Sequence, residues 1–148
     1  MKSGSKRLQF TFNTVINATD YILPAIAIVD SRIKDRPTTV PDFLADNVST
    51  GAVILDGKPR KLRELTMSDM LGPLRFNGET VTQGNTIFSL GNPLTATAWL
   101  GEKLAGCGKS LFKGSIVLTE SCLKATTSEK RSWKAEFDGF GRAEFDIV

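Results

Sequence analysis

Residues 91–111 read GNPLTATAWLGEKLAGCGKSL and contain the clearest helix signal in the chain. Asn92 suits the N-cap, because its side-chain oxygen accepts a hydrogen bond from a free backbone N–H, and Pro93 suits the first turn, where no N–H is needed. Apolar side chains follow at helical spacing, at Leu94, Ala98, Leu100 and Leu104. Gly106 or Gly108 is expected to end the helix. The chain therefore has one long helix with an apolar stripe.

Outward from this helix, most apolar segments predict strands. The expected strands are residues 8–12, 25–30, 51–55, 74–76, 80–84, 115–119 and two more around Asp138-Gly139. Asn77-Gly78 is a type I′ turn signal, which joins two of them into a hairpin. A short helix is expected at Tyr21–Leu23, capped by Asn17 or Thr19 and ended by Pro24, and residues 35–43 are expected to form a loop. Many strands with one good helix indicate the α+β class, with a rolled or barrel-like sheet.

Length and composition indicate one ordinary globular domain. The chain has 148 residues, of which 41% are hydrophobic and 24% charged. Its apolar runs are too short to cross a membrane, and its first ten residues lack the apolar centre of a secretory signal. We expect a single domain over residues 1–148, with residues 1–6 as a disordered lead-in, a cytoplasmic location and no membrane partner.

The chain contains no histidine. This excludes Ser-His-Asp and Cys-His catalysis and imidazole metal sites, so acid–base chemistry falls to carboxylates, lysines, the single tyrosine, a thiol or water. The two cysteines, Cys107 and Cys122, form no Cys-x-x-Cys pair and are expected as buried thiols.

The net charge of +3 is spread along the chain and is densest in residues 56–65, DGKPRKLREL. No aromatic residues interleave with these cations and no nucleic-acid-binding motif accompanies them. We therefore interpret the stretch as a solvated turn and expect no nucleic-acid partner.

Four polar clusters lie next to expected strands and could line a site. They are Asp30-Ser31-Arg32, Asp46-Asn47-Val48-Ser49, Gln83 to Asn85, and Thr119-Glu120-Ser121. For each cluster alone, a structural role as a strand-end ion pair or a turn is favoured over a ligand contact. Glu120 follows an apolar run and is a candidate acid or base, unless it points outward.

Five segments in order carry a resemblance to a known family. They are TDYILPAIAIVDSRI (19–33), LADNVSTGAVILDG (44–57), LRFNGETVTQG (74–84), LGNPLTATAWLGEKLAGCGKSLFKGSIVLT (90–119) and FDGFGRAEFDIV (137–148). Together, from about Leu8 to Val148, the chain resembles the C-terminal catalytic domain of the fumarylacetoacetate-hydrolase superfamily. The branch indicated is that of the 2-keto-4-pentenoate hydratases and 4-oxalocrotonate decarboxylases. The resemblance implies a mixed, barrel-like β roll with one main helix.

The resemblance also implies a metal site from which this sequence departs. Family members hold Mg²⁺ or Mn²⁺ with three carboxylates, two from a Glu-x-Glu pair on the first strand. If residues 7–12 are that strand, its ligand positions hold Arg7 and Gln9, and the third ligand position holds Ala27. We therefore expect no family-type metal site and no cofactor.

These observations favour a repurposed hydratase- or decarboxylase-like enzyme that acts without metal on a small oxo- or enol-type molecule, by lyase, isomerase or cyclase chemistry. Arg7 would stabilise an enolate or carboxylate oxygen in place of the metal. The candidate acids and bases are Asp30, Glu120 and Lys124. The candidate substrate-binding residues are Gln9, Ser31, Arg32, Asp46, Asn47, Ser49, Gln83, Thr119 and Ser121.

Two alternatives stay open. The first is a catalytically dead relative that serves as a binding or scaffold subunit and pairs with itself or with an active, full-length partner. Residues 133–140 would offer exposed aromatic side chains to that partner. The second, less favoured, is a metal-dependent hydratase whose ligands Asp30, Asp46 and Glu120 converge. In each case the expected assembly is a homo-oligomer, a dimer or larger, and the expected ligand is a small molecule.

Overall fold

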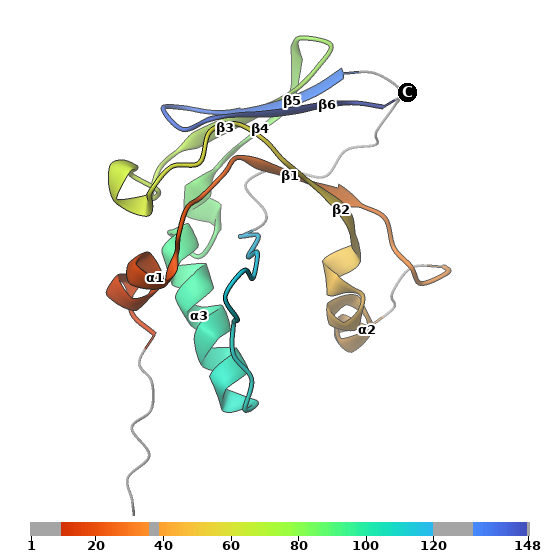
Figure 1. The fold of residues 1–148 in the computed structure, drawn as a ribbon. Helices are drawn as coiled ribbons and strands as arrows, with labels where there is room; N and C mark the ends of the chain where they lie inside the picture. The colour runs from red at the N-terminus through yellow and green to blue at the C-terminus, as the bar shows by residue number, and fades with distance from the viewer. Residues whose placement is uncertain (1–9, 36–38, 120–131, 148) are drawn as a thin grey trace, which may run out of the picture.

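A computed structural model describes residues 10–35, 39–119 and 132–147 (Figure 1). The helices are α1 (Phe12–Ala18), α2 (Val40–Ala45) and α3 (Pro93–Gly106), and the 3-10 turns are η1 (Asn47–Ser49), η2 (Leu62–Glu64) and η3 (Thr86–Phe88). The strands are β1 (Ala25–Val29), β2 (Thr50–Leu55), β3 (Leu71–Phe76), β4 (Glu79–Asn85), β5 (Ser132–Phe137) and β6 (Gly141–Asp146). No helix in these ranges is long and apolar enough to cross a membrane.

The described strands form two antiparallel sheets. β1 pairs with β2, and the second sheet has the order β4-β3-β5-β6. Both β1 and β2 contact β6, so the two sheets adjoin along one side, and in Figure 1 they lie above the helices. The predicted α+β fold with one main helix is confirmed, and the roll that these strands form is open, without closing into a barrel.

The long helix α3 has the ends that its sequence predicts. The Asn92 side chain accepts a hydrogen bond from the Leu94 N–H at 2.9 Å, and Pro93 occupies the first turn. The helix ends at Gly106, two residues before Gly108, which has a φ of +67°. On the buried side, a Cβ added to Gly101 would lie 2.5 Å from the Phe10 ring, so this glycine allows the chain before α1 to pack closely on α3.

The core lies on the inner face of the four-stranded sheet. It consists of Leu74, Trp133 and Ala135, with Ile26, Phe76, Phe137, Phe145 and Ile147 packed against them. The Trp133 and Phe76 ring centroids are 4.7 Å apart in a tilted arrangement. Trp133 is 4% exposed, so the expectation that it offers an exposed aromatic face to a partner is wrong. Alternation along β5 points this side chain inward.

The hairpin predictions are confirmed. Asn77 and Gly78 have φ values of +49° and +88° between β3 and β4, the left-handed pair that a type I′ turn requires. β5 and β6 likewise form a hairpin around Asp138-Gly139, with Ser132 opposite Asp146.

The predicted strand at residues 8–12 is wrong over its described part, because α1 begins at Phe12. Thr11 and Thr14 form a capping box, in which each backbone N–H donates to the other's hydroxyl oxygen. This local pairing overrides the alternating pattern. The helix expected at Tyr21–Leu23 is also wrong, because the helix lies one segment earlier and ends at Ala18, with Thr19 as its C-cap.

Three other local predictions need correction. Residues 115–119 form no strand, since Gly114 (φ +87°) turns the chain and the Ser115 N–H bonds the Phe112 carbonyl. Part of the expected loop at 35–43 forms α2, which Thr39 caps by accepting from the Asp42 N–H. Cys107 is exposed at the C-cap of α3, so the buried-thiol prediction is wrong for it, and Cys122 lies outside the described residues.

Candidate functional site

A groove of about 2900 Å³ lies between the sheets and the helices. Its walls are β1, the inner face of the four-stranded sheet, α1, the start of α3, and residues 110–119. That last segment returns toward the start of α3, where the Ser89 hydroxyl donates to the Thr119 carbonyl at 3.0 Å. The lining is mostly apolar, and Asp30, Ser31 and Ser49 add polar groups where β1 ends.

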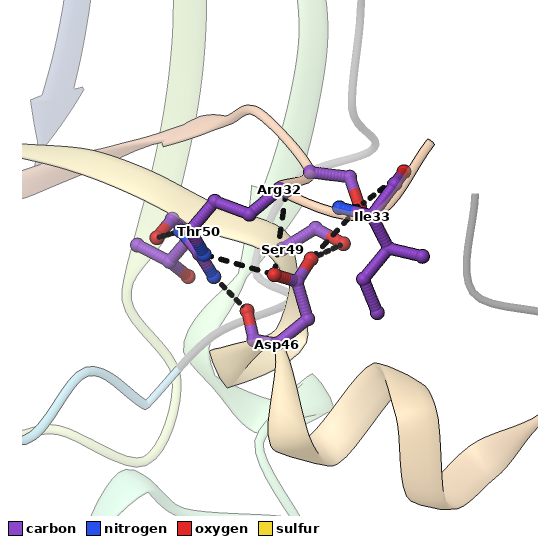
Figure 2. A network of polar contacts seen from close by, with 6 residues as sticks. Arg32, Ile33, Asp46, Ser49 and Thr50 are labelled. Carbon is purple, nitrogen blue, oxygen red and sulfur yellow. Dashed lines mark hydrogen bonds and ion pairs between the residues drawn. The ribbon is translucent and has the colours of Figure 1, made fainter. Parts of the chain in front are cut away.

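At this end of the groove, the buried Asp46 carboxylate gathers a polar network (Figure 2). The hydroxyls of Ser31 and Ser49 donate to its Oδ2 at 2.8 and 2.9 Å. Arg32 Nε lies 2.8 Å from its Oδ1, and the Arg32 N–H donates to the same oxygen at 3.3 Å. The side chain of Asp46 is 2% exposed and that of Arg32 is 53% exposed. One carboxylate therefore joins the chain after β1 to the end of α2.

The guanidinium of Arg32 extends this connection to β2. Its NH1 group donates to the Thr50 carbonyl at 2.8 Å, and its NH2 group donates to the Asp46 carbonyl. The Asp30 N–H donates to the Ser49 carbonyl at 2.8 Å. Because these bonds occupy Nε and both terminal nitrogens, we interpret Arg32 as a clamp on the backbone and not as a ligand-binding cation.

The pKa of Asp46 reflects this environment. Burial raises the pKa, but hydrogen bonds from Ser31 and Ser49 and the charge and N–H of Arg32 outweigh burial and hold the pKa below its ordinary value of 3.8. The carboxylate is thus ionised at neutral pH and fully engaged with its neighbours.

Next to Asp46, η1 is a left-handed turn. Asn47, Val48 and Ser49 have φ values of +52°, +56° and +57°. This conformation is uncommon for a β-branched residue such as Val48, and it costs about 1–2 kcal/mol per L-residue. The turn brings Ser49 back beneath the Asp46 carboxylate.

Replacing Val48 by glycine should therefore leave the free energy of unfolding unchanged or raise it by up to about 1 kcal/mol, because glycine accepts a positive φ without strain. Urea unfolding monitored by circular dichroism checks this. Ala52→Gly, in β2 and exposed at a position without positive φ, is the control and should be destabilising. A loss of more than about 1 kcal/mol in Val48→Gly would mean that packing of the half-buried valine outweighs the strain.

The structure brings four predicted site residues, Ser31, Arg32, Asp46 and Ser49, into one network, in which they bind one another. Asp30 lies beside them at the edge of the groove, and Thr119 lines its wall, whereas Gln83 is exposed on β4 and Asn47 is exposed in η1. The remaining predicted residues, Arg7, Gln9, Glu120, Ser121 and Lys124, lie outside the described residues. Arg7 and Gln9 precede the residues that the structure describes, so their assignment to a first strand stays a prediction.

Sequence reasoning missed the charged groups at the other end of the groove. Lys61 and Lys113 line it there, and Lys61 Nζ lies 2.8 Å from Asp20 Oδ1. The basic stretch at 56–65 otherwise pairs on the surface, through Arg60 with Glu64 and Arg63 with Asn17. These pairs agree with its interpretation as a solvated turn.

The described residues do not fit a three-carboxylate metal site. They contain no group of three Asp, Glu, Cys or His side chains that could hold an ion. Ala27, at a groove-lining position, has no donor atom, and the Asp46 carboxylate is already neutralised by Arg32. Convergence of Asp30 and Asp46 on a metal would require breaking this ion pair.

Comparison with known proteins identifies the fold. No family model matches the chain. It is 37% identical over 139 residues to the 2-keto-4-pentenoate hydratase of Burkholderia vietnamiensis, covering 91% of this chain and 53% of the relative. It is 33% identical over 126 residues to the 2-oxo-hept-4-ene-1,7-dioate hydratase of Escherichia coli, covering 81% of this chain and 47% of the relative.

Among solved structures, 4-oxalocrotonate decarboxylase from Pseudomonas putida G7, complexed with magnesium and adipate, matches with a TM-score of 0.85 and 26% identity. The match covers 93% of this chain and 52% of the decarboxylase. The chain belongs to the fumarylacetoacetate-hydrolase superfamily and corresponds to its C-terminal domain. Within it, the chain falls in the branch of the 2-keto-4-pentenoate hydratases and 4-oxalocrotonate decarboxylases. It spans about half the length of the curated relatives it matches.

Proposed function

We propose that this chain is a repurposed hydratase- or decarboxylase-like domain that acts without metal on a small oxo or enol acid. The matched relatives are named for 2-keto-4-pentenoate, 2-oxo-hept-4-ene-1,7-dioate and 4-oxalocrotonate, which are all small 2-oxo acids. Lyase and isomerase chemistry on such molecules passes through an enolate, which forms when a base removes a proton next to the carbonyl carbon or when carbon dioxide leaves. The route by proton removal needs a base.

The observation that carries this proposal is the position of Asp30. Its backbone is fixed by the bond to Ser49, its side chain lies at the edge of the groove, and among the described residues its carboxylate has no hydrogen-bond or ion-pair partner. A Cβ added to Gly51 in β2 would lie only 2.6 Å from Asp30 Cβ. The absence of a side chain at Gly51 therefore leaves room for the Asp30 side chain. The Asp30 carboxylate is therefore available to act as a base, and its backbone is held in place by the hydrogen bond to Ser49.

The other roles remain as the sequence suggests them. In this proposal Arg7 stabilises the enolate oxygen, Glu120 and Lys124 return protons, and Gln9, Thr119 and Ser121 contact the substrate. Four residues act indirectly, by holding the backbone of Asp30 in place: Ser31, Arg32, Asp46 and Ser49. Homo-oligomerisation and a cytoplasmic location also remain proposals.

Asp30→Asn should slow exchange of the C3 protons of 2-oxopentanoate by about 100-fold or more, because a general base contributes about 10²–10⁴ in rate. The measurement is proton NMR in D₂O with a chelator present. Asp35→Asn is the matched control, since Asp35 is also exposed but lies outside the groove lining. Gly51→Ala should also slow exchange by displacing Asp30. Equal rates in the wild type and Asp30→Asn would contradict the role of Asp30.

Metal removal gives a separate prediction. A ligand that binds only the folded state raises the melting temperature. We expect the chelator-stripped protein to melt at the same temperature, within about 1 °C, with and without millimolar Mg²⁺ or Mn²⁺, because a metal at tenfold its Kd would already add about 1.4 kcal/mol. A clear rise, with stoichiometric metal in the purified protein, would support the metal-dependent hydratase instead.

A non-catalytic binding subunit is the second candidate. It is favoured by the Asp46 network, whose hydroxyls and guanidinium bind within the protein and leave few groups for a substrate. The exchange experiment separates the two candidates, since a binding subunit would bind 2-oxopentanoate or a partner but would not exchange its protons.

A further inference from the structure

The turn between β3 and β4 contains a reactive pair of residues. Of the asparagines in the sequence, Asn77 alone is followed by a glycine. Both Asn77 and Gly78 are exposed at the tip of the hairpin, which projects from the four-stranded sheet (Figure 1). Nothing lies within 4 Å of the position that a Cβ on Gly78 would occupy. The surroundings of the Gly78 nitrogen are therefore open on that side.

The groups that could react with each other are not engaged elsewhere. Among the residues that the structure describes, neither the Gly78 N–H nor the side-chain amide of Asn77 has a hydrogen-bond partner. The turn is held instead by the Asn77 N–H, which donates to the Ser132 carbonyl at 3.2 Å. The Arg75 guanidinium donates to the Gly78 carbonyl at 3.5 Å, so a positive charge lies beside the turn. A nearby cation favours the negative charge that develops when the Gly78 nitrogen loses its proton.

We propose that Asn77 is a site of spontaneous modification, at which the side-chain amide is lost and the backbone rearranges. The Gly78 nitrogen attacks Cγ of Asn77, a succinimide ring forms, and the Cγ–Nδ2 bond breaks, so that the amide nitrogen leaves as ammonia with the proton of the Gly78 nitrogen. Water then opens the ring. Cleavage at Cγ gives aspartate, whereas cleavage at the Asn77 backbone carbonyl gives isoaspartate, whose chain runs through the side-chain carbon. In total, water is consumed and ammonia is released.

Asn47 provides a comparison within the same chain. It is also exposed and also has a positive φ, +52° against +49° for Asn77, but the residue after it is Val48. The branched Cβ of Val48 crowds its own backbone nitrogen, whereas Gly78 has no Cβ. The two asparagines thus share exposure and backbone conformation and differ in access to the attacking nitrogen. The proposal goes beyond the proposed function and does not depend on it.

The two products affect the hairpin differently. Aspartate followed by glycine forms the same two-residue type I′ turn. Isoaspartate adds a carbon atom to the backbone of this turn, and the turn sets the register of its strands. Leu74 and Phe76 on β3 pack in the core. The isoaspartate form should therefore melt at a lower temperature than the unmodified protein, and the aspartate form should not.

The test incubates the full chain near neutral pH and locates the modified residues by peptide mass mapping under mildly acidic conditions. Asn77 should convert about tenfold or more faster than Asn47, which is about 1.4 kcal/mol in the barrier. The rate should rise with pH, because the attacking nitrogen must lose its proton. Methyl transfer from S-adenosylmethionine by an isoaspartate methyltransferase detects the isoaspartate.

Two variants and a peptide complete the experiment. Gly78→Ala should slow the conversion of Asn77 by about tenfold or more. Asn77→Gly should remove methyl acceptance while keeping the turn, because glycine accepts a positive φ. A synthetic peptide of residues 74–82 reports the reactivity of the pair outside the fold. Equal rates at Asn77 and Asn47, or an intact Asn77 in the protein after the peptide has converted, would overturn the proposal. Isoaspartate and aspartate forms separated by ion exchange that melt alike would overturn the predicted effect on the hairpin.

Discussion

Replacing Trp133 by alanine lowers the free energy of unfolding by about 3–5 kcal/mol in our expectation, the range for a buried tryptophan or phenylalanine truncated in a packed core. Trp133 is 4% exposed and lies at the centre of the core with Leu74 and Ala135. Its ring also packs on Phe76, with centroids 4.7 Å apart. Since a domain of this size is stable by about 5–15 kcal/mol in all, the loss would leave a marginal protein.

Urea unfolding followed by far-ultraviolet circular dichroism measures this loss without depending on tryptophan fluorescence. Trp99→Ala is the matched control, because Trp99 lies on α3 with 52% of its surface exposed and with Lys103 over its ring. It should cost less than about 1 kcal/mol. If both variants lost the same free energy of unfolding, Trp133 would not be a central core residue of the four-stranded sheet.

Replacing Asp46 by asparagine should markedly lower stability at neutral pH and flatten the acid dependence of unfolding. The substitution removes the charge that Arg32 pairs with and places an amide N–H₂ against its guanidinium. Because the pKa of Asp46 lies below its ordinary value of 3.8 in the folded state, the ionised carboxylate stabilises the fold fully above that value. The stabilisation is lost as the pH falls below 3.8 and through the folded-state pKa.

The difference in stability between wild type and Asp46→Asn should therefore be largest near pH 7 and should shrink below pH 3.8. Thermal melting across that range checks it. Asp20→Asn is the control, because Asp20 also has a lowered pKa, through its hydrogen bond and charge pairing with Lys61, but on the surface. Solvent screens that pair, so its effect should be smaller at every pH. A constant difference between wild type and Asp46→Asn at all pH values would contradict the assignment.

The network also bears on the proposed function. If Ser31, Arg32, Asp46 and Ser49 hold Asp30 in position, Asp46→Asn should slow proton exchange on 2-oxopentanoate even under conditions where the variant remains folded. Because Asp46 stays ionised throughout the neutral range in the wild type, a slower exchange in the folded variant reports the placement of Asp30 and not a proton held by Asp46. A positioning role predicts slower proton exchange in the folded variant, whereas a purely structural role predicts lower stability with unchanged exchange in the folded fraction.

Local signals in the sequence determined several elements correctly. The Asn92-Pro93 start and glycine-rich end placed α3, Asn77-Gly78 placed the β3–β4 hairpin, and period-two alternation placed β5 and β6. Each of these signals acts through neighbouring residues, by a cap, a positive φ or a face that alternates along the strand. Such signals can be read without knowing what packs against them.

The predictions that failed came from segments whose sequence is compatible with two different local structures. Residues 8–12 alternate like a strand, but the Thr11 and Thr14 hydroxyls satisfy the backbone of a helix instead. Residues 115–119 are apolar enough for a strand, but their backbone pairs with no strand in the described ranges, and they line the groove beside α3. Cys107 follows an apolar helix face and is nevertheless exposed at its end.

The sequence by itself determined the fold class, the family resemblance, and that Asp30, Ser31 and Arg32 follow the end of a strand. Through the family resemblance, it also marked Ala27 as a residue without a ligand atom at a metal-ligand position. Only the tertiary structure decided what those polar residues do, because Ser31 and Arg32 are separated from Asp46 by about fifteen positions and meet it through the β1–β2 pairing. A carboxylate is a ligand or a structural anchor according to the donors that folding places around it, and for Asp46 those donors come from its own chain.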